Sequence, residues 1–420
     1  MAPADGSLKV YKRRIKRRKD VDEGMDRLSD LPDGIQHHIL SFLDTVSMVQ
    51  TSILSRRWRC VWKDVPALHF KRKRHYSKLD FSEHVSKLLS LRSGHAILEK
   101  VTFDYFWCPV QNGEPDMEVF DRVMQYAGSN GTGGHLHHLT FERLGNPYSS
   151  FEAMAASITK YRHHESLRYL RLYGSDLESP MTSGFKLLTT LRLHRCTLWY
   201  IDPFADFPCL NYLKLRDCSS LVNLVVSGPQ LVDLEMESTR CNGTTKTVEV
   251  FAPKLKSFDY SWTKMHFKDF PKLNLPVLDH ANICLHWYSI LHFNDGDILT
   301  EKANRACIDL LRGLHNVKSL NVGFEVYDDE EDGMQQNFPL TEMVSLMEPE
   351  ASPFTRLKTL KVHYRKGSSA PSIPYQVIVG ASDRCLDPTL LEPPILDKLI
   401  HAKTAETKEQ NSSVASPTSQ

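Results

Sequence analysis

The sequence lacks the features of a membrane or secreted protein. It contains no uninterrupted apolar run of the roughly 18 residues that a bilayer-spanning helix requires. The polar residues 1–7 are not followed by the apolar segment of a signal peptide. We therefore expect a soluble chain that is not secreted.

Paired cysteines and an excess of charge of one sign are also missing. The nine cysteines stand singly between Cys60 and Cys385 without a CxxC motif, a pattern that indicates reduced thiols in the cytosol or nucleus. The formal net charge is only +1, whereas attraction to nucleic-acid phosphates needs a pronounced basic excess. We expect neither a membrane nor a nucleic acid as partner.

Motifs for catalysis, cofactors and metals are not found. The glycine-rich segment 128–135 lacks the Lys and Ser or Thr that complete a phosphate-binding P-loop. The nearby His135, His137 and His138 have no cysteine or carboxylate at ligand spacing, and the acidic run 328–332 lacks the alternation of a calcium loop. The expectation is no catalytic residue, no cofactor and no metal.

What the sequence does contain is enough apolar material for a large core. Hydrophobic residues make up 41% and charged residues 25%, the shares of a folded protein with a solvated surface. The 420 residues exceed the usual size of one compact domain. Two domains or an elongated repeat array are therefore expected.

The N-terminal segment is dominated by positive charge. Residues 12–19, KRRIKRRK, hold seven basic side chains in eight positions, which repel one another, so we expect 1–25 to be a disordered arm. A nuclear import signal and a solvated tail both fit this segment. The import signal would place the protein in the nucleus, and the tail would leave it in the cytoplasm. The basic residues are Lys12, Arg13, Arg14, Lys16, Arg17, Arg18 and Lys19.

Residues 26–66 have the pattern of three short helices. In IQHHILSFL, starting at Ile35, the apolar residues fall on one face of an amphipathic helix, and a second apolar series starts at Val46. Ser55 is placed to cap a third turn that carries Trp58 and Trp62. A module of roughly 40 residues buries little surface alone, so we expect an apolar face that docks on a partner or a neighbouring domain.

The segments DLPDGIQHHILSFL and VQTSILSRRWRCVW within this module resemble the F-box of plant F-box proteins. The resemblance implies docking on a Skp-type adaptor, and through it on the cullin and RING subunits of a ubiquitin ligase. The residues expected at the adaptor are Leu31, Pro32, Ile35, Ile39, Leu40, Val49 and Trp58.

A repeated hexapeptide follows the helical module. LRYLRL, LTTLRL, LNYLKL, LVDLEM, LKSFDY and LDHANI begin at residues 167, 188, 210, 231, 255 and 278, at steps that fit leucine-rich repeats. Looser copies extend the array to 98–365, after a linker at 67–97. We expect an α/β fold in which leucines stack inside an irregular solenoid with a curved parallel sheet. The resemblance to plant F-box proteins with leucine-rich repeats then covers most of the chain.

The segment after the repeats changes in composition. Residues 366–420 are rich in Pro, Ser, Thr and Lys and are predicted to form a mostly disordered tail. Many similar plant proteins carry a small extra domain after the repeats, and none is recognised in this sequence.

Strand alternation predicts which repeat residues face the concave surface. Leucines at positions one, four and six point inward, so positions three, five and seven point outward. The basic and aromatic residues at these positions are Tyr169, Arg171, Tyr173, Arg192, His194, Tyr212, Lys214 and Arg216. The next two repeats place Asp233, Glu235, Glu237 and Asp259 there. A solvated ladder of charges and a binding site for a client's acidic segment or an anionic ligand both fit this pattern.

Two functions follow from these features. The first is the substrate-recognition subunit of a Skp–cullin–F-box ubiquitin ligase, in which the repeats bind the client protein and no catalytic side chain is needed. The alternative is a leucine-rich-repeat scaffold that binds proteins without a role in ubiquitination. Adaptor and cullin binding separates the two.

Replacement of the seven basic residues of 12–19 with alanine is expected to shift a fluorescently tagged protein toward the cytoplasm, because import receptors recognise dense basic charge. A control in which Lys12, Lys16 and Lys19 become arginine keeps the charge and should remain nuclear. If the alanine variant enters the nucleus as well as the control does, the arm is only a tail.

Overall fold

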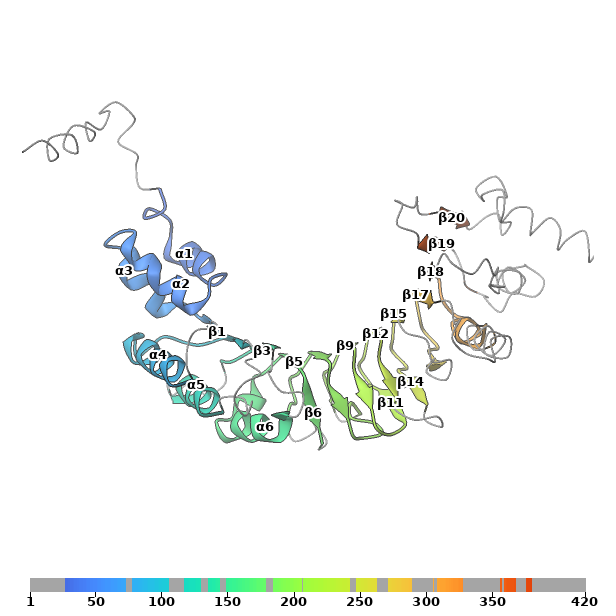
Figure 1. Cartoon of the computed structure of the whole chain (residues 1–420), viewed down its shortest axis with the longest axis horizontal. Helices are drawn as coiled ribbons and strands as arrows, with labels where there is room; N and C mark the ends of the chain where they lie inside the picture. The colour runs from blue at the N-terminus through green and yellow to red at the C-terminus, as the bar shows by residue number, and fades with distance from the viewer. Residues whose placement is uncertain are drawn as a thin grey trace, which may run out of the picture.

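The computed structural model describes residues 27–72, 78–105, 117–129, 135–143, 149–178, 184–205, 207–241, 247–262, 271–288, 305, 308–327, 356, 359–367 and 375–379. Short helices at the N-terminal end lead into an arc of strands (Figure 1). Within the described part, no helix has the length and apolarity to cross a membrane. The basic segment 12–19 lies outside the described residues.

The N-terminal module consists of three short α-helices and two 3-10 turns, as the apolar pattern predicts. In chain order they are α1 (Asp33–Leu40), α2 (Thr45–Gln50), η2 (Thr51–Ile53), α3 (Trp58–Val61) and η3 (Trp62–Asp64).

Polar side chains fix where two of these helices begin. Asp44 Oδ1 accepts hydrogen bonds from the backbone N–H groups of Val46 and Ser47, each at 3.0 Å, and so caps α2. Ser55 Oγ accepts a bond from the Trp58 N–H at 3.3 Å, which confirms the predicted cap of the third turn.

The main sheet of the arc has 12 strands whose spatial order follows the chain. All neighbours are parallel except the last pair, which is antiparallel. The strands are β1 (Ala67–Arg72), β2 (Lys100–Tyr105), β3 (His138–Arg143), β5 (Tyr169–Tyr173), β7 (Thr190–His194), β9 (Tyr212–Arg216), β12 (Asp233–Glu237), β15 (Ser257–Trp262), β17 (His280–Tyr288), β18 (Ser319–Tyr327), β19 (Thr359–Gly367) and β20 (Tyr375–Val379).

Helices and short strands form the outer side of the arc (Figure 1). The first units use α4 (Lys78–Leu91), α5 (Met117–Ser129), α6 (Phe151–Lys160) and η4 (His163–Glu165). A five-stranded sheet contains β4 (Ser149–Ser150), β6 (Ser175–Leu177), β8 (Thr197–Leu198), β10 (Ser219–Ser220) and β13 (Arg240–Cys241). A three-stranded sheet contains β11 (Leu224–Ser227), β14 (Val248–Phe251) and β16 (Lys272–Asn274).

The leucines of the repeated hexapeptide form the core between these layers. Leu170, Leu191 and Leu213 lie opposite one another on β5, β7 and β9, and each is completely buried. Burial alternates along each of these strands, as the period of two requires. Each buried leucine contributes about 1.5–3 kcal/mol relative to an exposed one, so the stacked ladder stabilises every strand through its neighbours. The predicted leucine-rich-repeat solenoid is confirmed.

The sheet begins and ends at positions that differ from the predicted boundaries. Residues 67–97, predicted as a linker, contain β1 and α4, and β1 pairs in parallel with β2. The segment VPALHF has the apolar spacing of the hexapeptide, but Val65 and Pro66 were assigned to the helical module, so the strand was missed. Residues 375–379, inside the predicted tail, form the antiparallel strand β20.

The helical module and the first repeat share one core. Trp58 and Trp62 belong to a continuous cluster of buried residues that runs from the helical module into the repeats and includes Leu68 and Phe70 of β1, and α2 contacts β1 directly. At this junction the side chain of Arg92, which follows α4, is 6% exposed and donates from Nη2 to the Val65 carbonyl at 2.8 Å. The module is therefore attached to the solenoid by packing as well as by the chain.

Phenylalanines add a second ladder across the first three strands. The ring of Phe103 on β2 stacks on Phe70 of β1 and Phe141 of β3, with centroids 5.5 and 5.4 Å apart. Phe120 of α5 meets the same ring edge-on at 5.5 Å. Such pairs add about 0.5–1.5 kcal/mol beyond area burial, so Phe103 is the centre of the N-terminal core.

Replacement of Phe103 with alanine is expected to lower the free energy of unfolding by about 3–5 kcal/mol, because it leaves a cavity in contact with three other rings. Urea unfolding followed by circular dichroism measures the loss. Phe251→Ala is the matched control, since Phe251 is 53% exposed and its truncation should change stability by about 0.5 kcal/mol or less. Equal effects of the two changes would contradict this description of the core.

Candidate docking and recognition surfaces

The helical module exposes an unusual number of large apolar side chains. Ile53 is 85% exposed and Phe42 is 73% exposed, although large apolar side chains are usually buried in a folded module. Exposed large apolar side chains concentrated in one small module point to an interaction site. The exposed set in this module is Leu28, Ile35, Ile39, Phe42, Ile53 and Leu54.

Only part of the predicted adaptor face lies on this surface. Ile35 and Ile39 of α1 are 49% and 37% exposed, and Pro32 before the helix is also exposed. Leu31 and Val49 are half-buried.

Two predicted adaptor residues lie in the core. Leu40 is completely buried and Trp58 is 3% exposed, so neither presents a side chain to a partner. The sequence pattern places apolar residues on one helical face but does not tell which of them meet the neighbouring helices. For the same reason Phe42, Ile53 and Leu54 were missed, although they belong to the same apolar series.

Hydrogen bonds hold the segment before α1 against the helices. The amide of the fully buried Gln36 donates to the carbonyls of Leu28 and Ser29 at 3.0 and 3.3 Å. The Arg57 guanidinium forms an ion pair with Asp33 at 2.7 Å and hydrogen-bonds to it, which lowers the pKa of the Asp33 carboxyl. These contacts order the segment that carries Leu28 in the exposed apolar set.

The sheet register brings the predicted concave residues together. Arg171 of β5 lies opposite Arg192 of β7, which lies opposite Lys214 of β9. The row continues into Glu235 and Asp259 on the next two strands. The predicted change from basic to acidic residues across neighbouring repeats is therefore present in the structure.

Two of the predicted cations on β9 form ion pairs with carboxylates on the neighbouring strand β12. Lys214 Nζ lies 2.5 Å from a Glu235 carboxylate oxygen, and Arg216 Nε lies 3.2 Å from Glu237. Burial raises the pKa of the Tyr212 hydroxyl, and its hydrogen bond to Glu235 raises it further. Burial would raise the pKa of Glu235, but hydrogen bonds from Lys214 and Tyr212 outweigh it and lower that pKa. Lys214 and Arg216 are therefore largely neutralised.

Arg192 is held by aromatic rings. Its guanidinium carbon lies 5.0 Å from the centre of the Tyr212 ring and 5.8 Å from that of Tyr169, distances at which cation–π attraction operates. Within the described part of the chain, neither Arg171 nor Arg192 has an ion pair with a carboxylate, and Arg192 Nε has no hydrogen-bond partner. These two arginines are the available cations of the predicted column.

His194 and Tyr173 are fixed by their neighbours at the end of the column. Their rings meet edge-on with centroids 4.6 Å apart, and Arg195 donates to the Tyr173 hydroxyl at 3.0 Å. Burial lowers the pKa of His194 although Asp217, 3.2 Å away, favours the protonated form. This end of the column supplies an aromatic surface whose side chains are held by contacts with their neighbours.

A shallow hollow of about 320 Å³ lies beside Arg171 on the same face. It is lined by side chains of β2, β3 and β5, and it combines cationic groups with two nearly buried threonines. The lining residues are Lys100, Thr102, His138, Thr140, Glu142, Tyr169 and Arg171. The sequence identified only Tyr169 and Arg171, because the concave column was aligned on the evenly spaced repeats from Leu167 onward, whereas the copies in β2 and β3 are separated by longer insertions.

Fold and surfaces together define a leucine-rich-repeat protein with an N-terminal helical module that exposes large apolar side chains. Residues 28–70 match the F-box domain family. An F-box/LRR-repeat protein of Arabidopsis thaliana is 25% identical over 322 residues, which cover 74% of this chain and 63% of that relative. F-box/LRR-repeat protein 25 of the same plant is 27% identical over 248 residues, 56% of this chain and 85% of that relative.

A third Arabidopsis thaliana relative, an F-box/FBD/LRR-repeat protein, is 40% identical over 210 residues, 49% of this chain and 45% of its own length. These matches agree with the fold: the chain carries an F-box domain at residues 28–70 and is similar to F-box/LRR-repeat proteins of Arabidopsis thaliana over much of its length. It spans less than two thirds of the length of two of the three relatives described.

Proposed function

We propose that this protein is the substrate-recognition subunit of a Skp–cullin–F-box ubiquitin ligase. The observation that carries the proposal is the exposed apolar surface of the F-box, which is attached to a repeat array with a separate polar concave face. The apolar surface of the F-box suits a permanent partner, and the polar concave face of the repeats suits a client. The protein's contribution to the reaction is proximity, because a bound client lysine experiences a high effective concentration of activated ubiquitin.

The adaptor site in this proposal is the exposed apolar set around α1 and η2. Ile35 and Ile39 stand four residues apart, so they lie on the same side of α1. Burial of a large aliphatic side chain contributes about 1.5–3 kcal/mol, so a few such residues can dominate an interface. Leu40 and Trp58 act indirectly in this account, because they hold the helices in place.

Replacement of both Ile35 and Ile39 with glutamate is expected to weaken binding to a Skp-type adaptor by about 3 kcal/mol or more, since two apolar contacts are lost and charge is buried. Isothermal titration calorimetry with purified adaptor measures the change.

Leu91→Glu is the matched control for this measurement. Leu91 ends α4 outside the F-box and is 48% exposed, the same degree as Ile35. The control should bind the adaptor as the natural chain does. Adaptor binding by the Ile35/Ile39 variant at full strength would contradict the proposed face and favour a scaffold that acts without the ligase.

The client site in this proposal is the part of the concave face around Arg171 and Arg192. Both guanidiniums lack carboxylate partners among the described residues, and tyrosines beside them supply contact area. Arginine and tyrosine are enriched where binding energy concentrates in interfaces. An acidic client segment fits this face, whereas the surface from Glu235 onward would repel it.

Reversal of Arg171 and Arg192 to glutamate is expected to reduce client capture about tenfold or more, with the loss greatest at low salt, because attraction becomes repulsion. Affinity purification from plant extract at two salt concentrations, with each protein captured by the natural chain quantified by mass spectrometry, measures the change. Lys186→Glu changes an exposed cation outside the strands and serves as the control. Unchanged capture by the double variant would place the client elsewhere.

Nuclear entry through residues 12–19 remains part of the proposal. It rests on the density of basic residues alone. The tagged alanine variant described above tests it independently of adaptor and client binding.

A further inference from the structure

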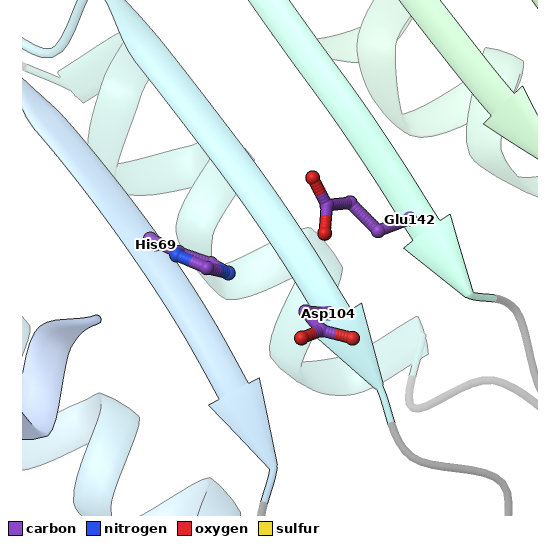
Figure 2. A group of neighbouring side chains, drawn as sticks. All are labelled: His69, Asp104 and Glu142. Atoms are coloured by element: carbon purple, nitrogen blue, oxygen red, sulfur yellow. The ribbon is translucent and has the colours of Figure 1, made fainter. Parts of the chain in front are cut away.

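The first three strands bring three side chains of metal-binding type together on the sheet. His69 of β1, Asp104 of β2 and Glu142 of β3 each place one ligand atom within 4.8 Å of the other two. Figure 2 shows the imidazole extending from β1 toward the two carboxylates on the neighbouring strands. The residues are 35 and 38 positions apart along the chain, so no local sequence motif connects them.

The histidine nitrogen gives the strongest indication that this group can bind a ligand. His69 Nε2 is inaccessible to water and has no hydrogen-bond partner in the described structure. A buried polar nitrogen without a partner is costly, and buried polar groups in native proteins are nearly always satisfied. A bound cation beside two carboxylates would satisfy this nitrogen.

One other cation reaches the group. Lys71 Nζ lies 3.4 Å from an Asp104 carboxylate oxygen, but the lysine side chain is 51% exposed whereas that of Asp104 is only 13% exposed. An ion pair that is half exposed on one side contributes little to stability, so a divalent ion can displace it. Glu142 has no cation partner of this kind among the described ion pairs.

We propose that His69, Asp104 and Glu142 form a binding site for a divalent transition-metal ion of the Zn²⁺ class. Imidazole nitrogen with carboxylate oxygen suits zinc, whereas calcium and magnesium take oxygen ligands only. Zinc ligands lie about 2.0–2.2 Å from the ion, so the widest separation in the group must shrink by roughly 1 Å. The Glu142 side chain has the rotatable bonds for that movement.

Such a site would leave one coordination position open toward the concave face. Glu142 also lines the hollow that contains Lys100 and Arg171. Three protein ligands are one fewer than a closed structural zinc site uses, so the remaining position takes water or a carboxylate oxygen. The site would thus add a fixed positive centre to a surface that already carries unpaired cations, and its existence does not depend on adaptor binding.

The experiment compares zinc binding by the full chain and by three variants after treatment with a chelator. Isothermal titration with Zn²⁺ gives stoichiometry and affinity, and the visible absorption of Co²⁺ reports nitrogen and oxygen ligation. Because the chain has 19 histidines and nine cysteines, the quantity of interest is the difference between variants. His69→Ala and Glu142→Gln remove ligands, whereas His138→Ala removes a neighbouring imidazole of the same hollow.

We expect His69→Ala and Glu142→Gln each to bind one equivalent fewer than the natural chain, or to bind it at least about tenfold more weakly, while His138→Ala retains it. Changes to outer-shell partners alone already cost about 10–100-fold in metal affinity. Glutamine has nearly the same shape as glutamate, and the Glu142 side chain is half-exposed, so the Glu142→Gln variant should fold. Its result therefore stands even if the His69→Ala variant fails to fold. Equal binding by all four proteins, or an equal loss with His138→Ala, would overturn the proposal.

Discussion

The shared core between the F-box helices and the first repeat is the constraint on which the rest of the structure depends. A helical module of this size cannot bury enough apolar surface to be stable alone. In this protein Trp58 and Trp62 pack into the same cluster as β1, and the nearly buried Arg92 hydrogen-bonds to the Val65 carbonyl between the two parts. Because the parts are packed together, the docking surface is fixed relative to the concave face.

The repeat array extends this fixed geometry along the chain. Each strand contributes buried leucines to its two neighbours, so stability is approximately a sum of unit and interface terms. The phenylalanine ladder around Phe103 strengthens the units next to the F-box. A continuous array of this kind would suit the proposed receptor, which has to hold a client at a set distance from the enzymes of the ligase.

The sequence predicts the fold well because its signals are periodic. The hexapeptides around Leu170, Leu191 and Leu213 specify both the strands and the buried positions, and the register of Arg171, Arg192 and Lys214 follows directly. The pairing of Lys214 with Glu235 was not predicted, because side-chain contacts between strands depend on rotamers that periodicity does not specify. The sequence therefore predicted the column but not which of its cations remain available.

The other misses have similar physical causes. The first strand was overlooked because its hexapeptide, VPALHF, was divided between the predicted helical module and the predicted linker. His69 lies on this strand, so its group with Asp104 and Glu142 was missed as well. Leu40 and Ile39 are adjacent in an amphipathic series, yet one is buried and the other exposed, because neighbouring helices decide which side is covered. Tertiary packing, not local pattern, supplies this information.

Native-state hydrogen exchange of the full chain tests the central claim, that the F-box and the first repeats form one cooperative unit. As denaturant is increased, amides of α3 and amides of β1 and β2 are predicted to exchange through the same opening, with equal free energies, because they share one core. Exchange of the α3 amides through a separate opening of much lower free energy, while β1 and β2 stay protected, would contradict the account.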